Sequence, residues 1–350
     1  MNTLAEDDTG IPLPRVSVVI PCHNYAAYLD AAIASALSQE GVAVDVTVVD
    51  DASTDGSLAL ARRWQAADPR VTVIAHEVNT GHIRTFNDAL GAATAPYLVK
   101  LDPDDLLPPR SLSRSAAVLR THPDVAFVYG RVVDFTDEPP DDLDARVRGV
   151  RIWPGEEWLA IRARRVRNVI FQPEVMIRRS ALAVVGGHRA DLPASSDFQL
   201  WLKLASVGAV ARVSGPVQGL YRIHAASMQR TIHAGKLADL HARVDAFDRF
   251  LDDRAGALAD PGRFRAVYRA SLARDALRLA AEELDDGEDA RPYMDAAAAL
   301  HPPITRGPRW RALRRRVLNR PGAAAAARLS LLERGISGRV RWRRWRRYGV

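Results

Sequence analysis

The segment that decides the fold is VSVVIPCHNYAAYLDAAIASALSQEGVAVDVTVVD, residues 16–50. Val16–Ile20 is a short run of mostly β-branched residues and predicts a strand, which we expect Pro21 to end. Apolar residues then recur at helical spacing over Ala26–Gln39, and Val44–Val49 predicts a second strand. A strand, a helix and a strand in this order are typical of the βαβ unit of a parallel sheet.

The same alternation of strands and helices continues further along the chain. We predict strands at Val71–Ala75, Tyr97–Leu101 and Val125–Tyr129, and helices at Ser57–Ala67, Ile83–Ala93 and Ser111–Arg120. Thr54 or Asp55 precedes the first of these helices and is placed to cap it. Strands separated by helices of this length predict a doubly wound α/β domain with a mostly parallel sheet, which we expect to span residues 15–230.

Three further segments flank this domain. Residues 1–14 carry three acidic residues and no apolar core, which predicts a flexible N-terminus and not a secretory signal. Residues 231–303 are rich in alanine, leucine and charged residues and show no strand pattern, so we expect a helical appendage. A group of prolines then predicts a hinge before a basic tail, residues 304–350.

Composition excludes several classes of protein. The chain has 350 residues, of which 47% are hydrophobic, so it can bury a substantial core. No apolar run reaches the ~18 residues that a membrane-spanning helix needs. Cys22 is the single cysteine, which excludes an internal disulfide and a cysteine-based zinc site and favours a reducing, cytoplasmic compartment.

The positive charge of the chain is concentrated in its tail. The formal net charge is +7, and residues 306–350 alone contain 15 arginines and one acidic residue, Glu333. Trp310, Trp342 and Trp345 are interleaved with these arginines. This composition predicts an anionic partner, and we favour the inner face of a cell membrane over a nucleic acid. A basic tail with no specific partner is the alternative.

Carboxylates directly follow two of the predicted strands. Asp50 and Asp51 follow the second strand, and Asp102, Asp104 and Asp105 follow the fourth. Open parallel sheets bind ligands outside the carboxyl ends of their strands. Closely spaced acids repel each other unless a cation lies between them, and Mg²⁺ and Mn²⁺ prefer oxygen ligands and often carry phosphate. The pattern favours a divalent cation and a nucleoside diphosphate, with purely structural acidic turns as the alternative.

Six motifs, in this order and spacing, resemble those of the family-2 glycosyltransferases of GT-A fold. They are SVVIPCHNYAAYLDAAIASAL, VVDDASTDGS, NTG with a following asparagine, LDPDD, SSDFQLWLKL and YRIH. The resemblance covers about Val16 to Met228, roughly two thirds of the chain. It implies a GT-A type doubly wound sheet that binds a nucleotide-diphospho-sugar donor.

The resemblance implies a nucleotide pocket at the ends of the first two strands. Asp50 and Asp51 would lie by the base, and one of their carboxylates would accept a hydrogen bond from the imide of a uracil. The alternative role for Asp50 is to anchor its own loop. Pro21, His23 and Asn24 would line the pocket through their backbone. A uridine nucleotide is therefore the expected donor.

The resemblance also implies a metal site at the DPD motif. Asp104 would bind Mn²⁺ or Mg²⁺ between the two phosphates, and Asp102 would contact the ribose or a metal-bound water. His224, in YRIH, matches the late histidine that completes this site in the family. Asp105 would support the site or cap the following helix. The cation would neutralise charge on the leaving diphosphate.

Asp197 is the expected general base, because it matches the aspartate of the Glu-Asp pair that the family carries before a Leu-Trp helix. Ser196 stands where that pair has glutamate, which departs from the pattern. The alternative role for Asp197 is to cap the helix predicted at Phe198–Ala205. Arg84 is a candidate to reach a phosphate, or else a solvated arginine on a helix.

The expected function is an inverting, metal-dependent transfer of a single sugar from a UDP-linked donor to a hydroxyl. The acceptor would be a glycan or lipid-linked glycan, such as a cell-envelope polysaccharide precursor, at the cytoplasmic face of the membrane. Residues 199–203 lack the Gln-x-x-Arg-Trp signature of processive synthases. One alternative is a sugar nucleotidyltransferase, which would need a glycine-rich basic loop after the first strand. The other is a non-catalytic protein that binds nucleotide sugars or anionic surfaces.

Overall fold

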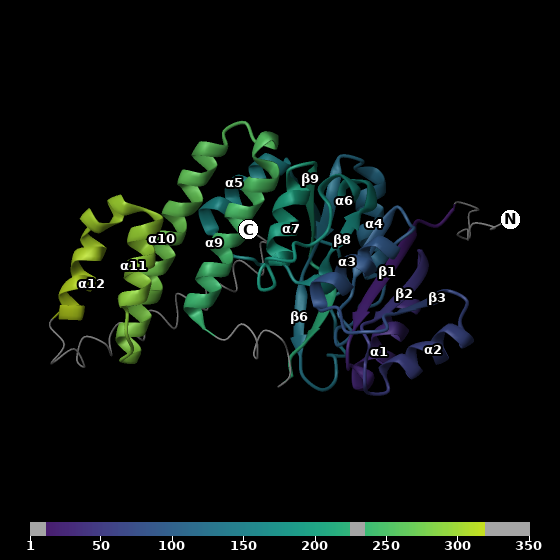
Figure 1. The fold of residues 1–350 in the computed structure, drawn as a ribbon. Helices are drawn as coiled ribbons and strands as arrows, with labels where there is room; N and C mark the ends of the chain where they lie inside the picture. The colour runs from purple at the N-terminus through teal and green to yellow at the C-terminus, as the bar shows by residue number, and fades with distance from the viewer. Residues whose placement is uncertain (1–11, 225–234, 319–350) are drawn as a thin grey trace. The chain divides into compact units, whose positions relative to one another are not determined.

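The computed structural model describes residues 12–224 and 235–318. The predictions of a flexible N-terminus and of a basic tail therefore lie largely outside the described residues. The chain divides into two compact units, which are drawn in Figure 1. The first unit contains the sheet, and the second contains the C-terminal helices together with Leu159–Val169.

The first unit is built around a large, mostly parallel sheet. Over the described residues its strand order is β3-β2-β1-β4-β8-β5-β9-β7. These strands are β1 (Arg15–Cys22), β2 (Ala43–Asp50), β3 (Val71–Ala75), β4 (Tyr97–Lys100), β5 (Val125–Tyr129), β7 (Gly149–Trp153), β8 (Met176–Arg178) and β9 (Ala209–Ser214). Only β8 and β7 run antiparallel to their neighbours in this described sheet. The arrangement confirms the predicted sheet, and β6 (Val132–Phe135) and β10 (Gly219–Arg222) pair separately.

The strands form where apolar β-branched residues run continuously, because a parallel sheet is covered on both faces. Val18 and Ile20 of β1 and Val46 and Val48 of β2 are fully buried between the helix layers. The observed bounds of β3 and β5 are those predicted, and β1, β2 and β4 differ from prediction by one or two residues at an end.

Pro21 does not end the first strand, contrary to the prediction. β1 continues through Pro21 to Cys22. The Val19 carbonyl accepts a hydrogen bond from Leu101, and the Cys22 carbonyl accepts one from Asp51, so alternate residues face β4 and β2. Pro21 therefore faces β4 beyond its last paired residue, where a missing N–H removes no hydrogen bond of the sheet.

Helices cover both faces of this sheet. They are α1 (Ala26–Leu37), α2 (Ser57–Ala67), α3 (His82–Ala92), α4 (Ser111–Thr121), α6 (Arg179–Val185) and α7 (Ser196–Ala205), with the short helix η1 (Gln172–Glu174). Helix α5 (Gly155–Arg165) begins in the first unit and ends in the second. The strand order reverses at β4, so right-handed crossovers place α3 on the face opposite α1 and α2 (Figure 1). Doubly wound sheets bind ligands outside the carboxyl ends of their strands at such a reversal, which here lies between β1 and β4.

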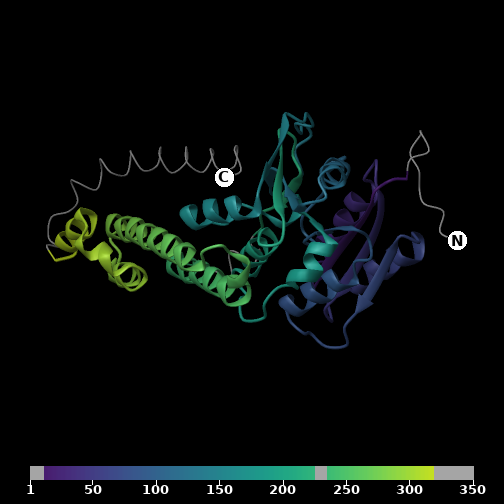
Figure 2. The same ribbon diagram turned by 90° about the horizontal axis from the view of Figure 1, so that it is seen from above.

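The second unit is helical in its described residues, which confirms the predicted helical appendage. Its helices are α9 (Lys236–Arg254), η2 (Ala255–Ala257), α10 (Pro261–Asp286), α11 (Arg291–Leu300), η3 (Pro302–Arg306) and α12 (Pro308–Leu318). The long helix α10 packs against α9, α11 and α12, as Figure 2 shows from above. Phe247 and Tyr268 stack between α9 and α10 with 4.7 Å between ring centroids.

The hinge predicted before the tail is helical instead. Pro302 opens η3 and Pro308 opens α12. Proline is tolerated in the first turn of a helix, because the N–H groups there have no acceptor within the helix. In the part of the chain that the structure describes, no helix has the length and apolar character needed to cross a membrane.

Candidate active site

Side-chain hydrogen bonds tie the loop after β1 to the loop after β2. Asn24 has a left-handed backbone conformation with φ of 61°, and its Oδ1 accepts hydrogen bonds from the N–H groups of Thr54 and Asp55 at 2.7 and 3.3 Å. His23 Nδ1 lies 2.8 Å from the carbonyl oxygen of Asp51. The residues predicted to line a nucleotide pocket therefore belong to one connected pair of loops.

Asp55 holds the starts of two helices and not one. Its Oδ1 accepts a hydrogen bond from Ser57 N at 2.8 Å at the start of α2, but the N-cap position is held by Gly56 and not by Thr54 or Asp55 as predicted. Its Oδ2 accepts one from Ala26 N at 3.0 Å, at the start of α1. This carboxylate satisfies N–H groups that a helix leaves without partners, and it joins the two loops further.

Asp51 fixes the loop between β3 and α3. Its carboxylate accepts hydrogen bonds from Thr80 N at 2.8 Å and Gly81 N at 3.0 Å, and its Oδ1 lies 2.8 Å from His76 Nδ1. Although burial raises the pKa of Asp51, these partners outweigh it and lower the pKa to about 2. Asp51 is therefore an ionised anchor whose oxygens already have partners.

Asp50 is completely buried and keeps one oxygen open. Its Oδ2 accepts a hydrogen bond from Ser53 N at 3.0 Å, which anchors its own loop. Its Oδ1 has no hydrogen-bond partner within the described residues. Buried carboxylate oxygens normally have a donor, so this atom marks a place where a ligand donor fits.

The acid-rich turn (Asp102–Asp105) brings Asp104 to His224. Asp104 Oδ2 lies 2.9 Å from His224 Nε2. The rings of Tyr28 and Tyr25 pack beside the imidazole, with 5.0 and 6.3 Å between ring centroids. The two residues predicted to bind a metal are therefore adjacent, and they present one carboxylate and one imidazole.

The carboxylates of the acid-rich turn repel one another. Asp105 is completely buried; its Oδ1 accepts a hydrogen bond from Arg222 N at 2.9 Å, and its Oδ2 has no partner within the described residues. Burial, together with the carboxylates of Asp104 and Asp102, raises the pKa of Asp105 well above its usual value. A cation bound here would relieve this repulsion.

The residues of the acid-rich turn fit a divalent cation. Among the described residues there is no group of three or more His, Cys, Asp and Glu side chains arranged as a metal site. Mg²⁺ usually takes one or two protein ligands, with phosphate and water completing its shell. Asp104 and His224 supply such a pair, and their acidic surroundings favour positive charge.

Arg222 holds the acid-rich turn in place. Its Nε donates to the Asp104 carbonyl at 3.0 Å, and its Nη1 donates to the carbonyls of Thr136 and Asp137 at 3.1 and 2.8 Å. Arg222 was not predicted as a site residue. Its position in the YRIH motif, two residues before His224, is the one sequence signal that could have pointed to it.

Lys100, the last residue of β4, is also a site residue that was not predicted. Its side chain is 3% exposed, and its Nζ donates a hydrogen bond to Asp102 Oδ1 at 2.9 Å. The same ammonium group lies 3.6 Å from the ring centroid of Phe86 on α3. The signal was a lysine inside the apolar run Tyr97–Leu101, directly before the acid-rich turn.

Asp197 lies in the first turn of α7 beside a buried histidine. His188 Nδ1 lies 3.5 Å from Asp197 Oδ1, and 36% of the Asp197 side chain is exposed. Burial raises the pKa of Asp197, but the charges of Lys100 and His188 outweigh it, so the pKa is lowered. Burial lowers the pKa of His188 to about 4. The N-cap of α7 is Ser195, so Asp197 does not occupy the capping position.

A glycine turn carries His188 to this position. Gly186 has a φ of 72°, and a Cβ on Gly187 would lie 2.1 Å from Asn87 Oδ1. Asn87 pairs with the backbone of His188, accepting from its N–H at 2.7 Å and donating to its carbonyl at 2.9 Å. Lys203 Nζ donates to the Gly187 carbonyl at 2.6 Å. Helices α3 and α7 thus hold the turn from both sides.

Arg84 stands apart from the other predicted residues. Its side chain is 71% exposed on α3, and its Nε lies 3.6 Å from Asp88 Oδ2. The structure therefore places it as a surface arginine with a neighbouring acid. A role in phosphate binding stays a prediction.

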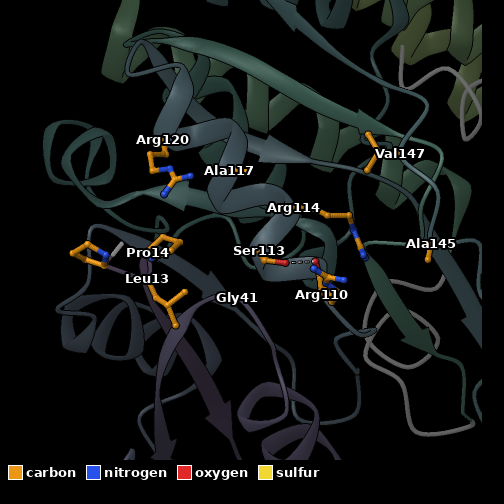
Figure 3. Close-up of a pocket in the computed structure, with 11 residues that line it drawn as sticks. Leu13, Pro14, Gly41, Arg110, Ser113, Arg114, Ala117, Arg120, Ala145 and Val147 are labelled. Carbon is orange, nitrogen blue, oxygen red and sulfur yellow. Dashed lines mark hydrogen bonds between the residues drawn. The ribbon is translucent and has the colours of Figure 1, made fainter. Parts of the chain in front are cut away.

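A separate cavity of about 560 Å³ opens at the opposite edge of the sheet. It is lined by Pro14, which precedes β1, and by Gly41, which precedes β2, so it lies at the amino ends of the strands. Figure 3 shows Arg110, Arg114 and Arg120 around it. None of the carboxylates predicted as site residues lines this cavity.

Solved structures with this fold have been determined with nucleotide sugars. A structure of S. aureus TarS residues 1–349 with UDP-GlcNAc matches with a TM-score of 0.60 and 15% identity, over 91% of this chain and 92% of that one. The mannosyltransferase PcManGT of Pyrobaculum calidifontis, with GDP-Man and Mn²⁺, matches with a TM-score of 0.53 and 20% identity, over 98% and 85% of the chains. The fold is thus of GT-A type.

The sequence comparisons give the family. The model of glycosyl transferase family 2 matches residues 17–184. The putative glycosyltransferase EpsE of Bacillus subtilis strain 168 is 31% identical over 198 residues, which are 56% of this chain and 68% of EpsE. The chain belongs to glycosyl transferase family 2. It spans less than half of several other curated relatives that it matches.

Proposed function

We propose that this chain is an inverting, metal-dependent glycosyltransferase that moves a single hexose from a UDP-linked donor to a hydroxyl group. The observation that carries the proposal is the pair formed by Asp104 and His224, which lies beside the buried carboxylate of Asp105. The neighbours solved with UDP-GlcNAc, and with GDP-Man and Mn²⁺, support a nucleotide-sugar donor and a divalent ion.

Donor binding is assigned to the loops after β1, β2 and β4. The open oxygen of Asp50 is the acceptor available to an imide N–H of the base. The backbone of Pro21, His23 and Asn24 lines the same loops, Asp102 faces the ribose, and Arg84 is the candidate for a phosphate. Asp51 supports this pocket by holding the loop before α3.

Asp104 and His224 are the residues that would hold Mn²⁺ or Mg²⁺. When bound, such an ion neutralises the negative charge that develops on the leaving nucleoside diphosphate. Arg222 keeps the Asp104 backbone in place through its carbonyl, so the carboxylate is presented without further ordering.

Asp197 is the proposed general base. Its lowered pKa keeps it ionised at neutral pH, and its exposed part is open to an acceptor hydroxyl. The acceptor oxygen forms a bond to the anomeric carbon while the bond from that carbon to the diphosphate oxygen breaks, and the hydroxyl proton passes to Asp197. A single displacement of this kind inverts the anomeric centre and needs no enzyme nucleophile.

A thermal-shift panel of nucleotide sugars with Mn²⁺ tests the proposal. A ligand that binds the folded state raises the melting temperature, so the right donor should stand out, and it should then be turned over with an acceptor. Stabilisation without any turnover would favour a non-catalytic binding protein. Pyrophosphate-releasing activity on a nucleoside triphosphate would favour a nucleotidyltransferase.

We also propose that residues 15–230 form the transferase domain, residues 231–303 form a helical appendage, and residues 304–350 attach the chain to an anionic membrane surface. The described part of this tail, α12, carries Arg309, Arg311, Arg314, Arg315 and Arg316 and no acidic residue. Each arginine near an anionic bilayer contributes about 1 kcal/mol of binding, and salt screens this attraction.

Removal of residues 319–350 tests the tail, because it spares α12, whose Leu313 is buried. The truncated chain should keep its activity on a water-soluble acceptor and should sediment less with vesicles containing phosphatidylserine at low salt. Equal sedimentation of both forms would contradict the membrane proposal. Tighter binding of the full chain to duplex DNA at matched salt would favour nucleic acid instead.

A further inference from the structure

The proposed donor site and the proposed base share one buried cation. Lys100 ends β4, its side chain is 3% exposed, and its Nζ donates a hydrogen bond to Asp102 Oδ1 at 2.9 Å. A hydrogen bond between two ionised groups is roughly twice as strong as a neutral one, so it fixes the orientation of the Asp102 carboxylate.

The charge of Lys100 also reaches Asp197. Asp197 receives its largest favourable charge interaction from Lys100, and this interaction lowers the pKa of Asp197 although burial raises it. Burial lowers the pKa of Lys100. The negative charges of Asp102 and, second, of Asp197 together have the larger effect, so the pKa of Lys100 is raised. Asp102 is therefore the ion-pair partner of Lys100, and Asp197 is a second carboxylate on which its charge acts.

Packing holds Lys100 in this shared position. The Phe86 ring lies under the ammonium group, 3.6 Å away, and the His188 ring packs on Phe86 with 5.6 Å between centroids. His188 in turn lies 3.5 Å from Asp197. A continuous set of side chains thus connects the acid-rich turn to the base through α3.

We propose that Lys100 is a positioning residue that orients Asp102 for the donor and, through Phe86 and His188, connects the acid-rich turn to Asp197 on the acceptor side. The inference rests on the proposed function and deepens it, because both halves of the reaction then depend on a residue that touches neither substrate. Burial of a lysine costs free energy unless its charge is used, and the two carboxylates are the groups that use it here.

The test compares Lys100→Met, which removes the charge and keeps the bulk, with Lys100→Arg, which keeps the charge. Binding of UDP in the presence of Mn²⁺ is measured by calorimetry, and kcat is measured against pH. Lys100→Met should weaken UDP binding about tenfold, the usual effect of losing a charged hydrogen bond. Lys100→Arg should bind UDP more tightly than Lys100→Met.

The pH profile separates this role from a purely structural one. The charged and titratable groups that act on Asp197 are Lys100, His188, His82 and Asp102, and of these only Lys100 is changed. Loss of the positive charge raises the pKa of Asp197, so the acidic limb of kcat should move to higher pH by about 1 unit in Lys100→Met. The limb should stay near its original position in Lys100→Arg.

Arg178→Met is the matched control, because Arg178 is a partly buried cation on β8 that donates to the carbonyls of Val125 and Leu119. It should lower the melting temperature without moving the acidic limb. Lys100→Gln serves as a second neutral variant if Lys100→Met does not fold. Unchanged UDP binding and an unchanged limb in a folded neutral variant would overturn the inference. Absence of nucleotide binding and transfer in the unaltered chain would overturn the proposed function itself.

Discussion

Two clusters of charged side chains in this molecule differ in what surrounds their carboxylates. In the second unit, the carboxylate of Asp275 accepts hydrogen bonds from Arg167, Arg243 and Arg278 at 3.1, 2.8 and 2.8 Å. In the first unit, the acid-rich turn carries three carboxylates that share fewer cations. The Asp275 carboxylate is therefore surrounded by cations, whereas the carboxylates of the acid-rich turn lie beside one another.

The pKa values of the carboxylates follow this difference. Burial raises the pKa of Asp275, but Arg167 and the other guanidinium groups outweigh it and hold the pKa far below its usual range. In the acid-rich turn, burial and neighbouring acids raise the pKa of Asp105. A cluster of the first kind stabilises the fold, whereas one of the second kind weakens the fold until a cation binds. The contrast distinguishes a structural cluster from a binding site.

Asp104→Asn should have the largest effect, because it removes the carboxylate that pairs with His224. Transfer should be nearly abolished while the melting temperature of the metal-free protein is kept, since the site lies at the edge of the sheet. Initial rates with the donor found by thermal shift measure the effect. Asp141→Asn, in an exposed loop, is the control and should be fully active. Near-normal turnover of Asp104→Asn in the presence of a chelator would contradict the metal site.

Asp197→Asn should lower kcat by ~10²–10⁴-fold, the usual contribution of a positioned base. Donor affinity should barely change, because Asp197 acts on the acceptor. Steady-state kinetics and calorimetry separate the two quantities, and Asp191→Asn on the preceding exposed loop is the control. A collapse of donor affinity with high residual turnover would make Asp197 a binding residue.

Asp275→Asn should destabilise the protein by about 3–5 kcal/mol, because it removes the buried carboxylate that three guanidinium groups share. Urea denaturation measures the loss, and the exposed Asp286→Asn is the control. The pKa of Asp275 is lowered in the folded state, so its contribution is present at neutral pH and is lost as pH falls below the unfolded value. A variant that unfolds like the unaltered chain would remove the structural role.

Asp105→Asn should have the smallest effect and the opposite sign. The asparagine oxygen can still accept from Arg222 N, and one of the repelling charges is gone. The melting temperature of the metal-free protein should rise by a few degrees, about 1 kcal/mol for a chain of this size. Differential scanning calorimetry with EDTA measures it. A fall in melting temperature would contradict the view that repulsion among the carboxylates of the acid-rich turn destabilises the metal-free protein.

The local pattern of the sequence predicted the first half of the sheet well. β3 and β5 have the predicted bounds, because a run of β-branched residues between helices needs no distant information. The short strands β6, β8 and β10 were not predicted, since they are three or four residues long and are set by their partners. We predicted that Pro21 ends β1, but the strand continues to Cys22. Whether a proline is tolerated there depends on which neighbouring strand its backbone nitrogen faces, and this follows from the register of the sheet.

The candidate site residues also divide into those that the sequence predicted and those that it did not. Asp104 and His224 were selected from motifs, and the fold brings them together. Lys100 and Arg222 were not selected, because their importance comes from partners that the fold supplies, such as the carbonyls of Thr136 and Asp137. A lysine in a buried strand is nevertheless a signal that sequence reading can use.

The bonds that Asp51 makes to the loop before α3 also have an entropic consequence. Ordering the backbone of one residue costs roughly 1–2 kcal/mol, and a loop that orders only on binding subtracts this cost from ligand affinity. Thr80 and Gly81 are already held by Asp51, and Thr54 and Asp55 are held by Asn24. A ligand that binds between these loops contacts backbone that was ordered during folding. Less of its binding free energy is then needed to order the loops, and more remains to distinguish one nucleotide from another.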